Sequence, residues 1–391
     1  MSIIERRILM LWVIASIFLF LYTFTQVDLS LTLSSLPFVA KVLLGFQYIG
    51  FFNRPMSSQM YLLLVLLFSS LYIFTVLRVG RKEISQKGLF KIIFAICILL
   101  TFSYNAFSYD IFNYIFDAKI VTHYHENPYI HKALDFPGDP MLSFMRWTHR
   151  VYPYGPVWLG LTVPLSFIGA GFFLPTFFLF KILAAVSYFC SVWFLYKIAL
   201  IVKKEKALLT TAIFALNPLV IVESLVSAHL DIVMTALMLI AVYYLFSKKN
   251  IKSYSFLILS IGIKYASGFL LPLFIFKKWM KSYFFEGAII LLFISIIAQA
   301  MRANLQPWYF VIIMPLIPLT HLKRPLIVNL LLSTAGLLYY LPPLFFGNWN
   351  KPVPEQLNLI VITSIFLIGG YLIYEIAVTV GLKKKKCIIT L

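Results

Sequence analysis

Residues 60–79 read MYLLLVLLFSSLYIFTVLRV, and the first charged side chain in this run is Arg78. A helix needs about 20 apolar residues to cross the hydrocarbon core of a bilayer, which is roughly 30 Å thick. The run has this length, whereas a surface helix of a soluble protein carries a charged face along its whole length. The stretch therefore predicts a transmembrane helix.

Apolar runs of this kind recur along the whole chain. Of its 391 residues, 61% are hydrophobic and 12% are charged, whereas about 25% are charged in soluble domains. So few polar side chains cannot cover a globule in water. We therefore predict one all-α multi-pass membrane domain over residues 1–391, with about ten full transmembrane helices. The runs are Ile8–Phe24, Met60–Val79, Phe90–Phe107, Pro175–Leu200, Ala207–Ile221, His229–Phe246, Tyr283–Ala298, Pro307–Leu319, Leu326–Phe346 and Leu359–Leu382.

The basic residues indicate an orientation. Lys and Arg number 33 against 14 Asp and Glu, a formal charge of +19. They gather in short clusters between apolar runs, which is the positive-inside pattern rather than the basic stripe of a nucleic-acid-binding protein. We expect the clusters and both termini to be cytoplasmic, with lipid contacts and no nucleic-acid partner. The clusters are Arg6-Arg7, Arg78 to Lys91, Lys203 to Lys206, Lys248 to Lys252, Lys277 to Lys281, Lys323-Arg324 and Lys383 to Lys386.

The number of membrane crossings between two loops must be odd if the loops lie on opposite sides and even if they lie on the same side. This rule singles out two apolar segments that cannot be simple transmembrane helices. If every basic cluster is cytoplasmic, Val157–Phe173 must enter the membrane and return outside. Ser255–Phe276 must likewise enter the membrane from the cytoplasmic side and return to that side, with a break near Gly262–Lys264. Broken backbone at membrane depth is tolerated where it lines a protein cavity, so the two segments predict a cavity that opens outside. Leu36–Phe52 is expected to lie in the membrane interface, with an eleventh span as the alternative.

Residues 108–156 form a 49-residue segment that we expect to be external. It holds five of the 14 acidic residues and four of the six histidines, together with many aromatic residues. Connectors between helices are usually two to eight residues long, so a loop of this composition is expected to be functional. A solvated cap is the alternative.

Asp110 is the leading candidate for chemistry in this loop. It follows an apolar run directly, and a carboxylate at such a depth is costly unless it has a partner or a function. Asp110 and Asp117 are seven residues apart, and Tyr114 lies one turn from Asp110, so the three share a helical face. The same spacing suits an amphipathic surface helix. A divalent metal at His123-x-His125-Glu126 is a further alternative, although a His pair at i and i+2 does not share a helical face.

Polar residues outside the loop are expected to face the same cavity. His229 and Asp231 begin a span on the outer side. Lys264 is a lone cation within a broken apolar segment, so it is expected to meet an anion such as phosphate, with snorkelling to the surface as the alternative. Arg302 is expected on the same face, where Trp308 could stack on a sugar or belong to the aromatic belt of the membrane.

These residues together resemble the polytopic GT-C glycosyltransferases, and most closely the bacterial polyprenol-phosphate-mannose-dependent mannosyltransferases. The resemblance covers about Asn105 to Tyr309, and its ordered set of motifs is more specific for the superfamily than for the sugar. The matching segments are Ser108–Tyr114 (SYDIFNY), Glu126–Tyr129 (ENPY), Trp147, Tyr154–Trp158 (YGPVW), Ala228–Asp231 (AHLD), Ile263-Lys264, Leu271-Pro272 and Gln306–Tyr309 (QPWY).

The resemblance implies a membrane hexosyltransferase of a bacterial or archaeal cell membrane. Its donor would be a polyprenyl-phosphate-linked sugar, with mannose expected, and its acceptor a glycan or glycolipid. Asp110 would be the general base of an inverting reaction at the outer face, while Lys264 and Arg302 would stabilise the leaving phosphate. The substrate-binding residues would be Tyr114, Asp117, Asn127, Tyr129, Trp147, Tyr154, His229, Asp231, Lys264, Arg302 and Trp308.

The sequence leaves other cofactor and function assignments as alternatives. No cofactor is expected, because Asp110 stands alone where some family members carry a D-x-D or E-D pair, although a divalent metal stays an alternative. A multi-pass transporter or flippase for lipid-linked sugars is the second hypothesis, and an assembly subunit is the third. Transporters often carry internal repeats with broken helices in matching places, and no such repeat is found here.

Overall fold

Helices form the regular structure of this protein. The computed structural model describes residues 1–276 and 282–389, and this part of the chain contains no β-strand. The predicted all-α class is thus confirmed. The α-helices are α1 (Ile3–Thr23), α2 (Pro37–Gln47), α3 (Arg54–Gly80), α4 (Gln86–Thr101), α5 (Asp110–Thr122), α6 (Pro156–Ile168), α7 (Phe173–Val202), α8 (Ala207–Ala215), α9 (Pro218–Ile221), α10 (Asp231–Phe246), α11 (Asn250–Ile261), α12 (Leu271–Ile275), α13 (Phe284–Ala303), α14 (Pro325–Leu338), α15 (Leu341–Phe346) and α16 (Val353–Ile389). Shorter helical turns that bear on the site are η6 (Val222–Val226), η7 (Tyr265–Leu270), η8 (Pro307–Ile312) and η9 (Ile317–Leu319).

Six of the described helical segments are long and apolar enough to cross a membrane, and a bent pair of segments, 204–215 and 218–226, gives a seventh. Fewer described helices are therefore long enough to be full spans than the ten expected. Helices α4 and α10 have 16 residues each, so each rises about 24 Å, less than the hydrocarbon thickness. The run Pro307–Leu319 forms only the short turns η8 and η9.

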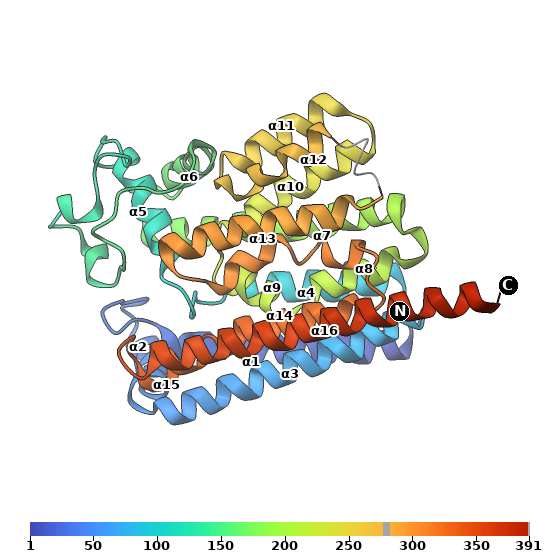
Figure 1. The fold of residues 1–391 in the computed structure, drawn as a ribbon. Coiled ribbons are helices and arrows are strands. Elements are labelled where there is room, and N and C mark those ends of the chain that lie inside the picture. The colour runs from blue at the N-terminus through green and yellow to red at the C-terminus, as the bar shows by residue number, and fades with distance from the viewer. Residues whose placement is uncertain (277–281, 390–391) are drawn as a thin grey trace.

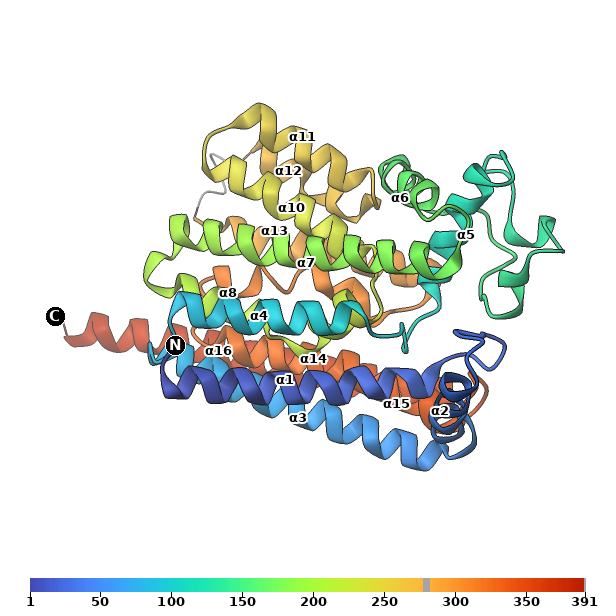
Figure 2. The same ribbon diagram turned by 180° about the vertical axis from the view of Figure 1, so that it is seen from behind.

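The long helices run roughly parallel in a bundle (Figure 1). Helices α1, α3 and α16 lie on one side, α10 to α12 lie on the other, and α7 and α13 run between them, as the opposite view also shows (Figure 2). Helix α7 packs against α4, α8 and α10, while α1 packs against α3 and α4. We name the end where α5 and α6 lie the loop end, and the end where α1 begins the terminus end.

Several of the basic clusters meet at the terminus end. The Ser85 amide before α4 donates to Glu5 at the start of α1 (2.8 Å), and Lys203 after α7 donates to the Thr320 carbonyl after η9. Clustering at one end is the arrangement that the positive-inside pattern requires, while the side of the membrane stays a prediction. The predicted cluster Lys277 to Lys281 lies outside the described residues.

The two apolar segments singled out above dock on each other, and the second of them is broken. Helix α11 ends at Ile261, and the chain then returns through η7 and α12, so that the Tyr254 hydroxyl donates to the Phe274 carbonyl (3.0 Å). The predicted hairpin of Ser255–Phe276 is thereby confirmed. Helix α6 is a separate 13-residue helix at the loop end (Figure 1).

Backbone hydrogen bonds join these two segments. The Gly155 amide donates to the Ile263 carbonyl (3.0 Å), and the Val157 amide donates to the Gly262 carbonyl (2.9 Å). Both glycines are required by the close approach, since a Cβ on Gly155 would overlap the Gly262 carbonyl and one on Gly262 would overlap the Val157 side chain. The turn that carries Lys264 is thus fixed against the start of α6.

Helix α2 lies across the loop end rather than along the bundle (Figure 2). With the turn that follows, it covers Pro37–Phe52, which is shorter than a membrane span. Phe38, Leu44 and Phe52 are exposed, whereas Gln47 is buried and donates to the backbone carbonyls of residues 27 and 28. These features favour the interfacial helix over the eleventh span.

Replacing Gly155 with Ala should lower the stability of the protein by about 1–3 kcal/mol, because the added methyl group must push the two docked segments apart. Thermal unfolding of the purified protein in detergent measures the effect. Gly160→Ala is the matched control, since a Cβ at this position of α6 meets nothing within 4 Å, and it should be neutral or slightly stabilising. Equal melting temperatures for Gly155→Ala and wild type would contradict this account of the contact.

Candidate active site

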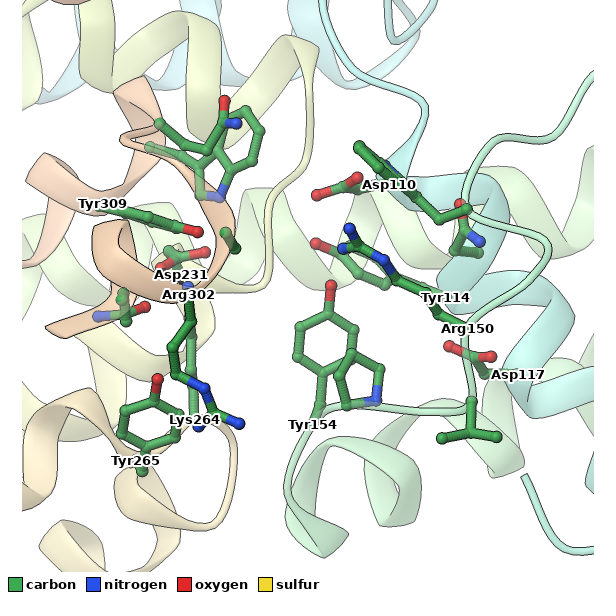
Figure 3. A pocket seen from close by; sticks show the side chains of 18 residues that line it. Asp110, Tyr114, Asp117, Arg150, Tyr154, Asp231, Lys264, Tyr265, Arg302 and Tyr309 are labelled. Carbon is green, nitrogen blue, oxygen red and sulfur yellow. Dashed lines mark hydrogen bonds and ion pairs between the residues drawn. The ribbon is translucent and has the colours of Figure 1, made fainter. Parts of the chain in front are cut away.

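A cavity of about 310 Å³ lies at the loop end, between α5 and the segments that carry residues 231, 264 and 299–309. Figure 3 shows its side chains on two facing walls. Nine of the residues predicted for the site line it, namely Asp110, Tyr114, Asp117, Trp147, Tyr154, Asp231, Lys264, Arg302 and Trp308. The fold therefore brings together residues that are up to 198 positions apart in the sequence.

Helix α5 supplies the first wall. It begins at Asp110, and Asp110, Tyr114 and Asp117 all line the cavity from one helical face, as their spacing predicts. The Asp110 side chain is 14% exposed. The Tyr114 ring contacts Tyr154 edge to face, with centroids 5.4 Å apart. This wall therefore combines two carboxyl groups with aromatic surface.

The opposite wall carries an ion pair. Lys264 Nζ lies 2.9 Å from Asp231 Oδ1, and the two side chains are 12% and 3% exposed. Lys264 also sits over the ring of Tyr309, 4.4 Å from the centroid. The prediction that Lys264 is a lone cation is therefore wrong, because the fold places a carboxylate from another helix beside it. Its low exposure also disfavours snorkelling.

Two arginines bring positive charge to the cavity without an ion-pair partner among the described residues. Arg302 lies near the end of α13 and lines the cavity. Arg150 stacks on Trp147, with its guanidinium carbon 4.2 Å from the ring centroid. Trp147 has a positive φ of 55°, which is strained for a bulky residue. An anionic group in the cavity would meet at least these two unpaired cations.

A cluster of three contacting residues, Asp28, Tyr109 and Arg146, holds the loop around Trp147 against α5. Asp28 accepts a hydrogen bond from Tyr109 Oη (3.0 Å) and lies 3.8 Å from an Arg146 nitrogen. Arg146 in turn covers the Tyr109 ring, 4.7 Å from its centroid, and its carbonyl accepts from Asn113 (2.7 Å). The contacts explain how Trp147 and Arg150 are kept at the cavity.

Three predicted site residues do not line the cavity. Asn127 accepts from the Tyr129 amide (3.0 Å), and the Tyr129 hydroxyl donates to the Tyr154 carbonyl (3.3 Å). Both residues therefore shape the loop behind Tyr154. The sequence did not predict this, because neighbouring positions in a loop do not reveal which side chains point into a cavity. His229 was expected at the cavity mouth but is 1% exposed, stacked against Trp308 with ring centroids 3.9 Å apart.

Sequence reasoning missed several lining residues and one buried acid. Arg150, Tyr265 and Gln299 line the cavity, and Glu223 is fully buried beside His229. A signal existed for two of these residues. Glu223 and Gln299 are polar residues within or at the end of apolar runs, and such residues are functional candidates by default. Nothing in the local sequence distinguishes Arg150 from the other basic residues of its loop.

The two carboxyl groups of α5 titrate differently. Burial raises the pKa of Asp110 to about 6, an effect that Lys264 opposes and Asp231 reinforces. Burial alone raises the pKa of Asp117 to about 8. Near neutral pH Asp110 is therefore largely ionised and can accept a proton, whereas Asp117 is largely protonated and can donate a hydrogen bond. Pairs of carboxyl groups with separated pKa values are typical of acid–base sites.

The sequence offered a divalent metal at His123-x-His125-Glu126 as an alternative. No group of three or more His, Cys, Asp or Glu side chains is arranged to hold a metal ion within residues 1–276 and 282–389. His123 and His125 are exposed loop residues.

The fold and the cavity thus define a multi-pass membrane protein whose scarce charges converge on one pocket. Residues 23–281 match the model of the alpha-(1->6)-mannopyranosyltransferase N-terminal domain family, and the chain belongs to this family. It is therefore a membrane mannosyltransferase, and not a transporter, a flippase or an assembly subunit. No curated protein and no solved structure shows significant similarity to the chain. The matched region contains Asp110, Asp231 and Lys264.

The raised pKa of Asp117 predicts a pH-dependent stability. Folding favours the protonated form, so its contribution is fully present below the unfolded pKa of about 3.8 and is lost as pH rises through about 8. Asp117→Asn should therefore stabilise the protein relative to wild type by about 1 kcal/mol or more at pH 8, and by less at pH 5. Thermal unfolding at the two pH values tests this. Glu205→Gln, an exposed change outside the cavity, is the control and should show no such difference.

Proposed function

We propose that the protein transfers a mannosyl group from a polyprenyl-phosphate donor to a hydroxyl group of a glycan or glycolipid acceptor, with Asp110 as the base. The observation that carries the proposal is the arrangement of the cavity, where an ionisable carboxylate faces a wall with Lys264 and Arg302 (Figure 3). In a displacement at a sugar carbon, a base is needed beside the attacking hydroxyl group and cations are needed beside the leaving phosphate. The two facing walls of the cavity supply these groups.

In the proposed reaction, the acceptor oxygen attacks the anomeric carbon as Asp110 takes its proton. The bond between the anomeric carbon and the phosphate oxygen breaks, and the electron pair leaves with the phosphate. Positioned cations stabilise charge that develops on a leaving group, which assigns this role to Arg302 and Lys264. Because Asp110 lies on the wall opposite Arg302 and Lys264, attack and departure occur on opposite faces of the sugar, and the configuration inverts.

The aromatic residues of the cavity suit a sugar substrate. Trp147, Tyr154, Tyr309 and Trp308 present flat apolar rings together with O–H and N–H groups. We place the loop end at the outer face of the membrane and both termini in the cytoplasm, because the basic clusters meet at the terminus end. We assign no cofactor to this reaction.

Asp110→Asn should reduce mannosyl transfer by about 10²–10⁴-fold, the usual contribution of a positioned base. The assay supplies purified protein in detergent with radiolabelled polyprenyl-phospho-mannose and an α-mannoside acceptor. Glu205→Gln, an exposed acid outside the cavity, should keep wild-type activity. Transfer that survives Asp110→Asn would remove Asp110 as the base, and transfer from a nucleotide sugar but not from the lipid-linked donor would disprove the proposed donor class.

Arg302→Met should raise the KM for the lipid-linked donor by about 10- to 100-fold, since a hydrogen bond to a charged group contributes about 1.5–3 kcal/mol. Lys264→Met should reduce activity as well, and it also leaves Asp231 without its ion-pair partner. Steady-state kinetics with varied donor measure both effects. Lys132→Met, a loop cation outside the cavity, is the control. A donor KM unchanged in Arg302→Met would show that this arginine does not bind the phosphate.

A further inference from the structure

A buried chain of polar groups lies directly behind Asp110. His229 Nδ1 is 3.6 Å from Asp110 Oδ2, and His229 Nε2 is 3.4 Å from Glu223 Oε2. Glu223 also accepts a hydrogen bond from the Tyr340 hydroxyl (2.8 Å). His229 is 1% exposed and Glu223 is fully buried. An imidazole thus separates the carboxylate of the cavity from a second carboxylate in the interior.

The protons of this chain follow from its geometry. A neutral imidazole has one N–H group and one acceptor nitrogen, and here each nitrogen faces a carboxyl oxygen. A proton must therefore lie between His229 Nε2 and Glu223, on either atom, because two lone pairs would otherwise face each other across a buried contact. With the proton on Glu223, the single N–H group of the neutral imidazole is on Nδ1 and points towards Asp110. With the proton on Nε2, the neutral ring would instead turn a bare nitrogen towards Asp110, so an ionised Asp110 requires the arrangement with a protonated Glu223.

The ring is also held in place. Trp308 stacks on it at 3.9 Å with an interplanar angle of 16°, so that the imidazole cannot tilt away from the two carboxyl groups. The contact of 3.6 Å with Asp110 is longer than a hydrogen bond, and catalytic hydrogen bonds often shorten as the reacting complex forms. A contraction of a few tenths of an ångström suffices here.

We propose that His229, backed by Glu223, is a positioning residue for Asp110: its Nδ1–H donates to Asp110 Oδ2, which keeps this carboxylate ionised and aimed into the cavity. The inference rests on the proposed function of Asp110 as the base. It also assigns a role to the buried acid Glu223, which faces His229 Nε2. A buried carboxyl group is costly at this depth unless neighbouring polar groups compensate it. His229 then lies behind the reaction rather than in contact with the substrate.

Other charged groups face the same two side chains and must stay unchanged in the test. Lys264 and Arg150 lower the pKa of Asp110, Asp231 raises it, and a hydrogen bond from Trp147 lowers it. Lys264 also faces His229 electrostatically. Substitutions at His229 leave all of these in place.

The test measures the pH profile of kcat/KM for mannosyl transfer, whose acidic limb reports the base in the free enzyme. His229→Leu should move this limb to higher pH by about one to two units, the effect of losing a hydrogen bond to a charged group. His229→Asn can place its amide nitrogen near the position of Nδ1 and should restore most of the shift. His229→Gln, whose amide reaches towards Glu223 instead, should not restore it.

The controls separate positioning from folding. Ser224→Ala removes a buried polar group from the same turn as Glu223 and should leave the limb where wild type has it. A limb unchanged in His229→Leu, with lower rates at every pH, would overturn the inference and leave His229 a purely structural residue. If His229→Leu does not fold, identical limbs in His229→Asn and His229→Gln overturn it. Absence of transfer by wild type at any pH would instead disprove the proposed function.

Discussion

The ion pair between Asp231 and Lys264 is the contact on which the cavity depends. Two charges at membrane depth are costly unless they compensate each other, and here the carboxylate begins α10 while the cation follows the break of α11. The pair holds the returning hairpin against the neighbouring helix, and the backbone bonds between residues 155–157 and 262–263 fix the same turn to α6. The two charges thus compensate each other at the point where the hairpin meets the cavity.

The five acids of the loop divide into two groups with different roles. Asp110 and Asp117 line the cavity, whereas the other three acids of the loop hold its shape. Asp139 is bonded to Lys119 and Tyr124, and Glu126 and Asp135 both flank His131. Much of the polar content that suggested function in this loop therefore stabilises it, which is what a 49-residue connector requires if it is to hold Trp147 and Arg150 over a site.

The features that sequence predicted well are those with a local periodic cause. Helical spacing placed Asp110, Tyr114 and Asp117 on one face, and Gly262 within an apolar run predicted the break of the hairpin. Predictions failed where the partner comes from elsewhere in the chain. The partner of Lys264 lies 33 residues away, and His229 is enclosed between Asp110, Glu223 and Trp308, which no spacing rule relates.

The sequence by itself determined that this protein is an all-helical membrane protein with its basic residues gathered between apolar runs, because lipid excludes unpaired backbone and charged side chains wherever they occur. Its motifs also pointed to the mannosyltransferases, the family that residues 23–281 match. Only the tertiary structure decided which polar side chains face one cavity, which are paired and which lie behind it. The physical reason is that the energy of a buried charge depends on its nearest partners, and those are set by packing between helices that are distant in sequence.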